Sequence, residues 1–151
     1  MRKNVFPILA IAFLIASCKG SADKKVPEIA ADYCKCFEKL EKEMSDESKK
    51  LFTAAGNAAD PTKTLEEELL KLDEETQGKV GIELMSLGEL EDESSEMGSC
   101  IKGVEKKYGK QYTLDEKKFA NNIIKELEAK PGCSFTASLM KVGLKVEESK
   151  K

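Results

Sequence analysis

The sequence predicts an all-α domain: a small bundle of four or five helices stapled by two disulfides. Apolar residues recur at spacings of three and four over most of the chain, which is the pattern of one buried helix face. No run alternates convincingly between apolar and polar residues, as a half-buried strand would. Four of the five cysteines lie beyond the N-terminal region, an even set typical of a disulfide framework. The length of 151 residues has room for one domain, which we place at residues 26–148.

The first residues have the pattern of an export signal. Residues 1–4 include Arg2 and Lys3, and the twelve residues from Val5 to Ala16 are apolar, with Pro7 among them. Twelve residues are too few to cross a bilayer, because an α-helix needs about 20 to span the hydrocarbon core. We therefore expect residues 1–17 to be a signal peptide.

The end of this signal carries a more specific pattern. The sequence Ile15-Ala16-Ser17-Cys18 resembles the lipobox of bacterial lipoproteins. In that family the cysteine thiol is alkylated with diacylglycerol, the peptide is cut just before the cysteine, and the new amine is acylated. The resemblance covers residues 1–18 and implies that Cys18 is a lipidation site. Plain secretion after Ser17 fits less well, because Ile15 would stand where a small residue is preferred, and an uncleaved anchor is a third interpretation.

The lipobox resemblance also implies a cellular location. A single myristoyl chain holds a protein only marginally, at about 0.8 kcal/mol per buried CH₂, so three acyl chains would anchor it almost permanently. Lys19 follows the cysteine, whereas Asp at that position retains lipoproteins of enteric-type bacteria in the inner membrane. The expected location is the outer membrane, on its periplasmic face or at the cell surface. Residues 18–25 form a polar tether that reaches about 25–30 Å when extended, so the domain would sit close to the membrane.

The charge of the chain excludes some partners. Without residues 1–17, the 25 basic residues lose Arg2 and Lys3, and the remaining 23 face 28 acidic ones, a formal charge of −5. Nucleic-acid binding needs a clustered basic surface, and adhesion to anionic lipid needs basic residues near the bilayer. We expect neither.

The first helix is predicted from about Pro27 at least to Met44. Pro27 suits a first turn, and the apolar phase continues through Leu51 and Ala55 to Gly56, a plausible residue to follow a helix C-terminus. Asp60 and Pro61 then give the next helix an N-cap and a first residue, and Thr64 to Glu67 offers a second cap.

Two cysteines lie in the first helix. At about 100° per residue, Cys34 and Cys36 point roughly 200° apart, so they cannot easily bond to each other, because a disulfide needs its two Cβ atoms about 3.8 Å apart and facing. Each is expected to pair with either Cys100 or Cys133, in an order that stays open. Each bridge would contribute on the order of 4 kcal/mol in the chain-entropy model.

A single apolar stripe runs from Leu65 to Tyr108, and it would make a helix of more than 40 residues if unbroken. An unbroken antiparallel helix would carry Cys100 roughly 28 Å past Cys36 at 1.5 Å per residue. The stretch must therefore break, and we expect the break at Thr76–Gly81 or at Gly88–Gly98, where glycine lowers helix stability by about 1 kcal/mol.

Two further helices complete the predicted bundle. Thr113 to Glu116 reads as a capping box, and the Lys130-Pro131-Gly132 run ends the helix that follows. A last short helix begins near Cys133, and residues 149–151 are expected to fray. The inward-facing residues of the two helices are predicted to be Phe119, Ile123, Ile124, Leu127, Phe135, Leu139, Val142 and Val146.

Two other roles for the cysteines remain open. Cys34 and Cys36 form a Cys-x-Cys pair for thiol-redox chemistry, although the motif with a clear mechanism is Cys-x-x-Cys. The thiols could instead bind Cu(I) with Met44 and Met97 as thioether ligands, although methionine at helical spacing is more often core filler. Zinc is disfavoured, because the paired C-x₂₋₄-C knuckles of structural zinc sites are missing.

Catalytic patterns are missing from the sequence. It has no histidine, which excludes Ser-His and Cys-His nucleophile pairs and His-ligated metals. The acidic runs Glu66 to Glu68, Asp73 to Glu75 and Glu89 to Glu96 fall on polar helix faces or in a break, and we interpret them as solvated surface. The last run lacks the spacing of an EF-hand calcium loop, and its charge would suit a basic partner. We expect no enzymatic activity, cofactor or resident metal.

The observations together favour a lipid-anchored envelope protein that binds another protein or helps to organise the envelope. Its expected partners are the membrane, through the lipid on Cys18, and an envelope protein. The alternative is a thiol-redox or copper-handling protein that uses the Cys-x-Cys pair.

Overall fold

The computed structural model describes residues 25–90, 92–109 and 116–149, and all structural statements below refer to these residues. Within them the chain forms seven α-helices and a 3₁₀ helix at Leu87–Leu90, without strands. The elements are α1 (Val26–Glu43), α2 (Asp46–Asn57), α3 (Pro61–Leu69), α4 (Glu74–Ser86), η2 (Leu87–Leu90), α5 (Glu96–Tyr108), α6 (Glu116–Glu128) and α7 (Ser134–Ser149). The all-α class is confirmed, and the prediction of four or five helices is wrong because the apolar pattern runs through several chain breaks.

The first of these breaks divides the predicted first helix. α1 ends at Glu43, Met44 is extended at φ −78° and ψ 141°, and α2 begins at Asp46. Ser45 caps α2 by accepting a hydrogen bond from the backbone N–H of Ser48. The apolar phase stays continuous across this corner, so periodicity alone predicted one helix where there are two.

The long apolar stripe is broken twice. Asp60 is the N-cap of α3 and Pro61 its first residue, as predicted. The chain leaves the helix after Leu69 and restarts with Asp73 as the N-cap of α4, so residues 76–81, one of the two positions expected for a break, lie inside a helix. The second interruption, between the end of α4 at Ser86 and the start of α5 at Glu96, overlaps the predicted 88–98 region and contains η2.

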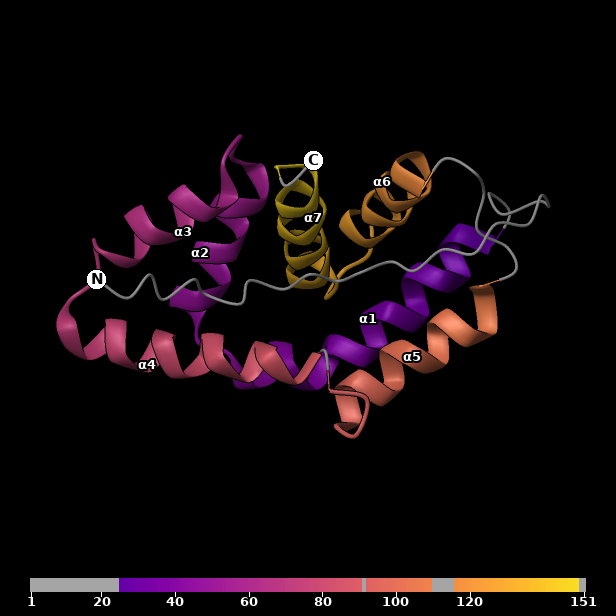
Figure 1. The fold of residues 1–151 in the computed structure, drawn as a ribbon, viewed down its shortest axis with the longest axis horizontal. Coiled ribbons are helices and arrows are strands. Elements are labelled where there is room, and N and C mark those ends of the chain that lie inside the picture. The colour runs from indigo at the N-terminus through magenta and orange to yellow at the C-terminus, as the bar shows by residue number, and fades with distance from the viewer. Residues whose placement is uncertain (1–24, 91, 110–115, 150–151) are drawn as a thin grey trace.

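Helices α1 and α7 organise the packing (Figure 1). α1 lies against α5, α6 and α7, and α7 also packs against α2, α3 and α6. Phe52 from α2 meets Phe135 from α7 edge to face, with ring centroids 5.8 Å apart. The eight inward-facing residues predicted for the last two helices are all buried. Gly132, in the predicted stop after α6, has a φ of +79°, which only glycine adopts readily.

Other expectations fall outside the described residues. The capping box predicted at Thr113 to Glu116 lies largely in the range 110–115, which the structure does not describe. The signal predicted at residues 1–18 lies in the range 1–24, which is also not described. α7 continues to Ser149. None of the helices in the described part of the chain is long and apolar enough to span a bilayer.

One buried hydroxyl in α7 yields a stability prediction. The Thr136 side chain is 0% exposed, and its Oγ1 has no hydrogen-bond partner among the described residues. A buried polar group left unpaired costs about 1–3 kcal/mol, so Thr136→Val should raise the free energy of unfolding by roughly 1 kcal/mol. Urea denaturation of the purified domain measures this change. Thr136→Ala also removes a methyl group and should not stabilise; equal stabilisation by both variants would contradict the explanation.

Candidate functional site

The structure selects one of the two disulfide pairings that the sequence left open. Cys34 bonds to Cys133, and Cys36 bonds to Cys100. Cys34 and Cys36 therefore form disulfides with different cysteines, as predicted from the roughly 200° between their side chains on the helix. The first bridge joins α1 to the chain just before α7, and the second joins α1 to α5.

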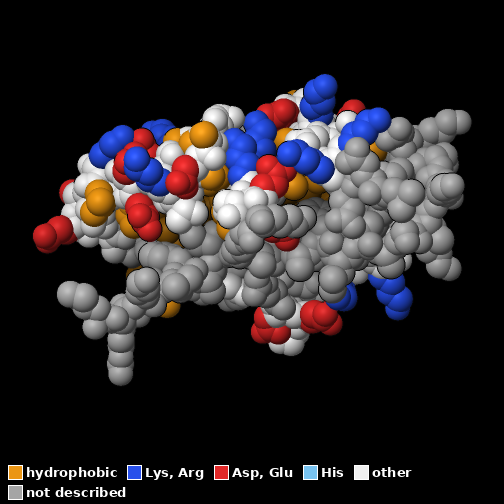
Figure 2. Space-filling model, turned by 45° about the horizontal axis from the view of Figure 1, so that its top comes forward, with side chains coloured by type: hydrophobic (Ala, Val, Ile, Leu, Met, Phe, Trp, Pro, Cys, Tyr) orange, Lys and Arg blue, Asp and Glu red, His pale blue; other side chains and the backbone are white. Residues whose placement is uncertain are grey.

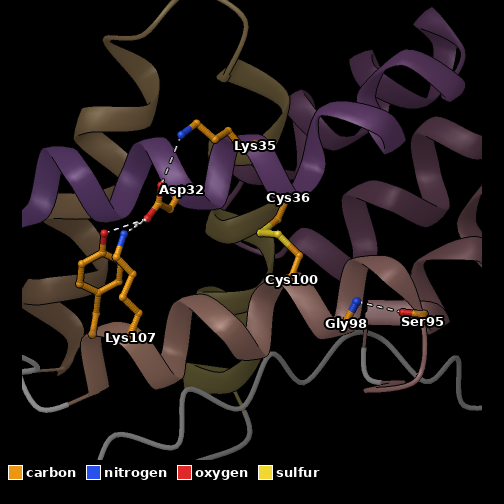
Figure 3. The surroundings of a disulfide bond; sticks show 8 residues. Asp32, Lys35, Cys36, Ser95, Gly98, Cys100 and Lys107 are labelled. Atoms are coloured by element: carbon orange, nitrogen blue, oxygen red, sulfur yellow. Dashed lines mark hydrogen bonds and ion pairs between the residues drawn. A yellow bond between two sulfur atoms is a disulfide. The ribbon is translucent and has the colours of Figure 1, made fainter.

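The contact between α1 and α5 contains polar ties on both sides of its disulfide, of which Figure 3 draws the one at Asp32. Figure 3 shows Asp32 and Cys36 of α1 facing Lys107 and Cys100 of α5. At one end Lys107 Nζ donates to Asp32 at 2.8 Å, and at the other Lys39 Nζ meets Glu96 at 3.0 Å. The pairing order shows that the two helices run antiparallel.

The Tyr108 hydroxyl completes the first of these ties. It lies 2.8 Å from Asp32 Oδ2 and 3.0 Å from Glu28 Oε1, and the tyrosine is 1% exposed. Burial, together with the two neighbouring carboxylates, raises the pKa of Tyr108 to about 12. Hydrogen bonds from Lys107 and then from Tyr108 lower the pKa of Asp32, and the bond to Asp32 raises the pKa of Lys107. Each of these shifts moves a pKa further from pH 7. At neutral pH Asp32 therefore stays negative, Lys107 stays positive and Tyr108 stays uncharged, and the cluster acts as a structural tie.

The start of α5 is built to bring Cys100 back to α1. Ser95 caps the helix by accepting a hydrogen bond from Gly98 N–H at 2.9 Å. A Cβ at Gly98 would lie 2.1 Å from the Asp92 carbonyl oxygen, a backbone atom that cannot easily move away. Only glycine fits this close approach, which folds the loop tightly against the first turn of α5.

A pocket lies beside the Cys36–Cys100 disulfide. Its volume is about 230 Å³, and both cysteines line it together with Met97. Lys39 and Glu96, which pair with each other, belong to its border and are exposed. The disulfide therefore faces a solvent-accessible hollow.

The second exposed feature is α4, which Figure 1 shows extended along one edge of the molecule. Val80 is fully buried, whereas Ile82 is 72% exposed and Met85 is 79% exposed. Ile82 and Met85 are three residues apart and share one helix face. Gly78 lies on that face too, and a Cβ there would meet nothing within 4 Å. Nothing among the described residues covers this face, which we call the Ile82–Met85 face.

One carboxylate fastens the opposite side of α4. Glu83 Oε2 accepts hydrogen bonds from Ser48 Oγ at 2.6 Å, from Ser45 Oγ at 2.7 Å and from Ser45 N–H at 3.0 Å. Desolvation raises the pKa of Glu83, but these hydrogen bonds outweigh it, and the pKa lies below the ordinary value of 4.5. Nothing in the local sequence links position 83 to the corner between α1 and α2, so this anchor could not be predicted from the sequence.

The Glu83 anchor gives a pH-dependent prediction. Its stabilisation is complete above pH 4.5 and is lost as the pH falls through the lowered folded-state pKa, because the folded state favours the carboxylate. Glu83→Gln should lower the free energy of unfolding by about 1–3 kcal/mol at pH 7. The difference from wild type should shrink in denaturation curves measured below pH 4.5. Glu75→Gln, at an exposed position of the same helix, should change stability by less than about 0.5 kcal/mol; a pH-independent effect of Glu83→Gln would contradict the assignment.

The remaining predicted site residues are separated. Cys18 lies outside the described residues. Met44 is 4% exposed in the core, and Met97 lines the pocket next to the Cys36–Cys100 disulfide. With both disulfides formed, the four described cysteines carry no thiolate for a soft metal. No metal-binding group of three or more Cys, Asp or Glu side chains occurs in the part of the chain that the structure describes.

The Ile82–Met85 face was also missed by the sequence analysis. The available signal was that neither residue belongs to the apolar stripe of the segment, so both are apolar side chains out of phase with the buried ones.

Comparisons with protein-family models, with characterised proteins and with solved structures found no match to this chain.

Proposed function

We propose that this chain is a lipid-anchored protein of the bacterial envelope, attached to the outer membrane through Cys18, whose helical domain binds another protein. The proposal has two supports. The lipobox resemblance at residues 15–18 supports the anchor. The Ile82–Met85 face supports protein binding and is the single observation on which that part rests.

Two large apolar side chains are exposed on α4, although the opposite side of this helix is fixed to the domain. α4 buries Val80 and is fastened by Glu83, so its opposite side is free to contact a partner. Large aliphatic side chains are among those most often buried, and adjacent exposed ones gain free energy when a partner covers them. Gly78 lets a partner approach the helix backbone closely.

The charge of the segment that contains this face favours one kind of partner. Residues 60–86 carry eight acidic and three basic side chains, a formal charge of −5. A second copy of the chain would bring the same negative segment against itself, and an anionic lipid surface would repel it. A protein with an apolar ridge flanked by Lys or Arg complements the face in both respects.

Site-specific crosslinking tests the binding part. A photoreactive residue at position 85 of the full chain, expressed in its own cell, should give one dominant protein adduct. Ile82→Asp should reduce the adduct on the order of tenfold by placing a charge where the partner needs an apolar contact. A photoreactive residue at Lys50, exposed on α2, is the matched control and should not give the same adduct.

Other adducts would overturn the proposal. A crosslink to a second copy would replace the partner by self-association, and a lipid adduct would assign the face to the bilayer. An adduct that Ile82→Asp leaves unchanged would remove the role of this face. The anchor is tested separately by the intact mass of the native protein, where an unmodified Cys18 thiol would contradict lipidation.

A further inference from the structure

We propose that the Cys36–Cys100 disulfide is a thiol-exchange site for low-molecular-weight thiols, whereas Cys34–Cys133 is a permanent staple. This inference does not depend on the proposed function. It rests on the different surroundings of the two bridges and on the pocket beside one of them.

The two disulfides differ in accessibility. Cys100 is exposed and its partner Cys36 is 7% exposed. Cys133 is 5% exposed, and its partner Cys34 is half-buried against the core. Exchange requires a thiolate to reach a disulfide sulfur, so access helps to decide which bridge reacts.

The geometry also selects the sulfur that is attacked. An incoming thiolate approaches a disulfide sulfur from the side opposite its partner. Cys36 is 7% exposed, whereas Cys100 is exposed and lines the pocket, so an incoming thiolate has more room to approach at Cys100. The new bond therefore forms at Cys100, and Cys36 is the leaving thiolate.

The pocket limits the size of the thiol. Its volume of about 230 Å³ is below the range of about 300–1,000 Å³ typical of drug-sized ligands, so it suits a thiol as small as cysteine. Lys35, Lys39, Glu43 and Glu96 all contribute to the lining, and their charges balance. Size, and not charge, is therefore the expected basis of selection.

The exchange balances as two thiolate displacements. A first thiolate RS⁻ forms a mixed disulfide with Cys100 Sγ and breaks its bond to Cys36, which leaves as a thiolate. A second RS⁻ attacks the sulfur of R in that mixed disulfide, releases RSSR and leaves the Cys100 thiolate. Solvent protonates both protein thiolates according to pH. Two RSH molecules are oxidised, and one protein disulfide is reduced by two electrons.

The fold is able to survive this reaction. The Tyr108–Asp32 and Lys39–Glu96 contacts still join α5 to α1 on either side of the opened bridge. Ile101 and Val104 of α5 remain part of the buried core. The Cys34–Cys133 bridge stays closed, with Cys133 buried and Cys34 half-buried.

The test is partial reduction of the full chain with both disulfides formed. Free cysteine is added, the reaction is quenched with acid, and peptide mass spectrometry locates free thiols and mixed disulfides. Cysteine should appear on Cys100, with Cys36 free, on the order of tenfold faster than Cys34–Cys133 opens. This measurement needs no variant, so a folding defect cannot obscure it.

Three results would overturn the inference: equal rates for the two bridges, faster opening of Cys34–Cys133, or cysteinylation at Cys36.

A thiol-terminated polyethylene glycol polymer should react at Cys100 on the order of tenfold more slowly than cysteine, and equal rates would remove the role of the pocket. Cys36→Ser combined with Cys100→Ser should abolish the fast phase and leave the slow one. A fast phase that persists in this variant would also contradict the proposal.

Discussion

Replacing both Cys34 and Cys133 with serine is expected to lower the free energy of unfolding by about 4–5 kcal/mol. The bridge spans 99 residues and ties α1 to the start of α7, so its removal releases most of the chain in the unfolded state. Serine at the buried position 133 would add the cost of a hydroxyl in apolar surroundings. Urea denaturation at neutral pH, followed by circular dichroism, measures the change.

The second bridge is the matched comparison. Cys36–Cys100 spans 64 residues, and Cys100 is exposed, so serine at position 100 remains solvated. The loss for the Cys36→Ser/Cys100→Ser variant should be about 4 kcal/mol, slightly smaller than for the first pair. A loss below about 1 kcal/mol for the Cys34 and Cys133 pair would contradict their role as the main staple.

Truncating Phe37 should have the other large effect. Phe37 lies in α1, the helix that touches α5, α6 and α7, and it is 1% exposed. Phe37→Ala should reduce the free energy of unfolding by about 3–5 kcal/mol, through lost burial and the cavity left behind. The same denaturation experiment measures it. An effect below about 1 kcal/mol would show that the surrounding helices do not form the packed core described above.

Ile82→Ala is the control for this prediction. Its side chain is 72% exposed, so the change in stability should stay within about 0.5 kcal/mol. A loss comparable with that of Phe37→Ala would mean that the Ile82–Met85 face is covered within the domain, and it would contradict the proposed docking role as well. The two measurements together separate residues that hold the fold from residues that are free to contact a partner.

The domain thus has a strongly held part and a lightly held part. α1 is joined by two disulfides to α5 and to the residue just before α7, and its apolar face is buried. α4 has few neighbours, and its ties to the rest include the Glu83 hydrogen bonds, the buried Val80 and the partly buried Leu84, which packs against the core. The exposed Ile82–Met85 face of α4 is therefore attached to the part of the domain that the two disulfides crosslink.

Sequence alone determined the features that depend on a few neighbouring residues. Helical periodicity placed the buried faces of α6 and α7, and Asp60 with Pro61 marked the start of α3, because caps and amphipathic faces are local. The geometry of one helix was enough to exclude a bond between Cys34 and Cys36.

Only the tertiary structure decided features that depend on which helices become neighbours. The order of the disulfides follows from α7 lying on one side of α1 and α5 on the other, which no local pattern states. The corner at Ser45 is secured by Glu83, 38 residues away in sequence. The Ile82–Met85 face and the pocket at Cys100 exist because neighbouring elements leave those surfaces uncovered. Such exposure is a property of the assembled packing, since a helix with apolar residues on two faces does not itself specify which face is buried.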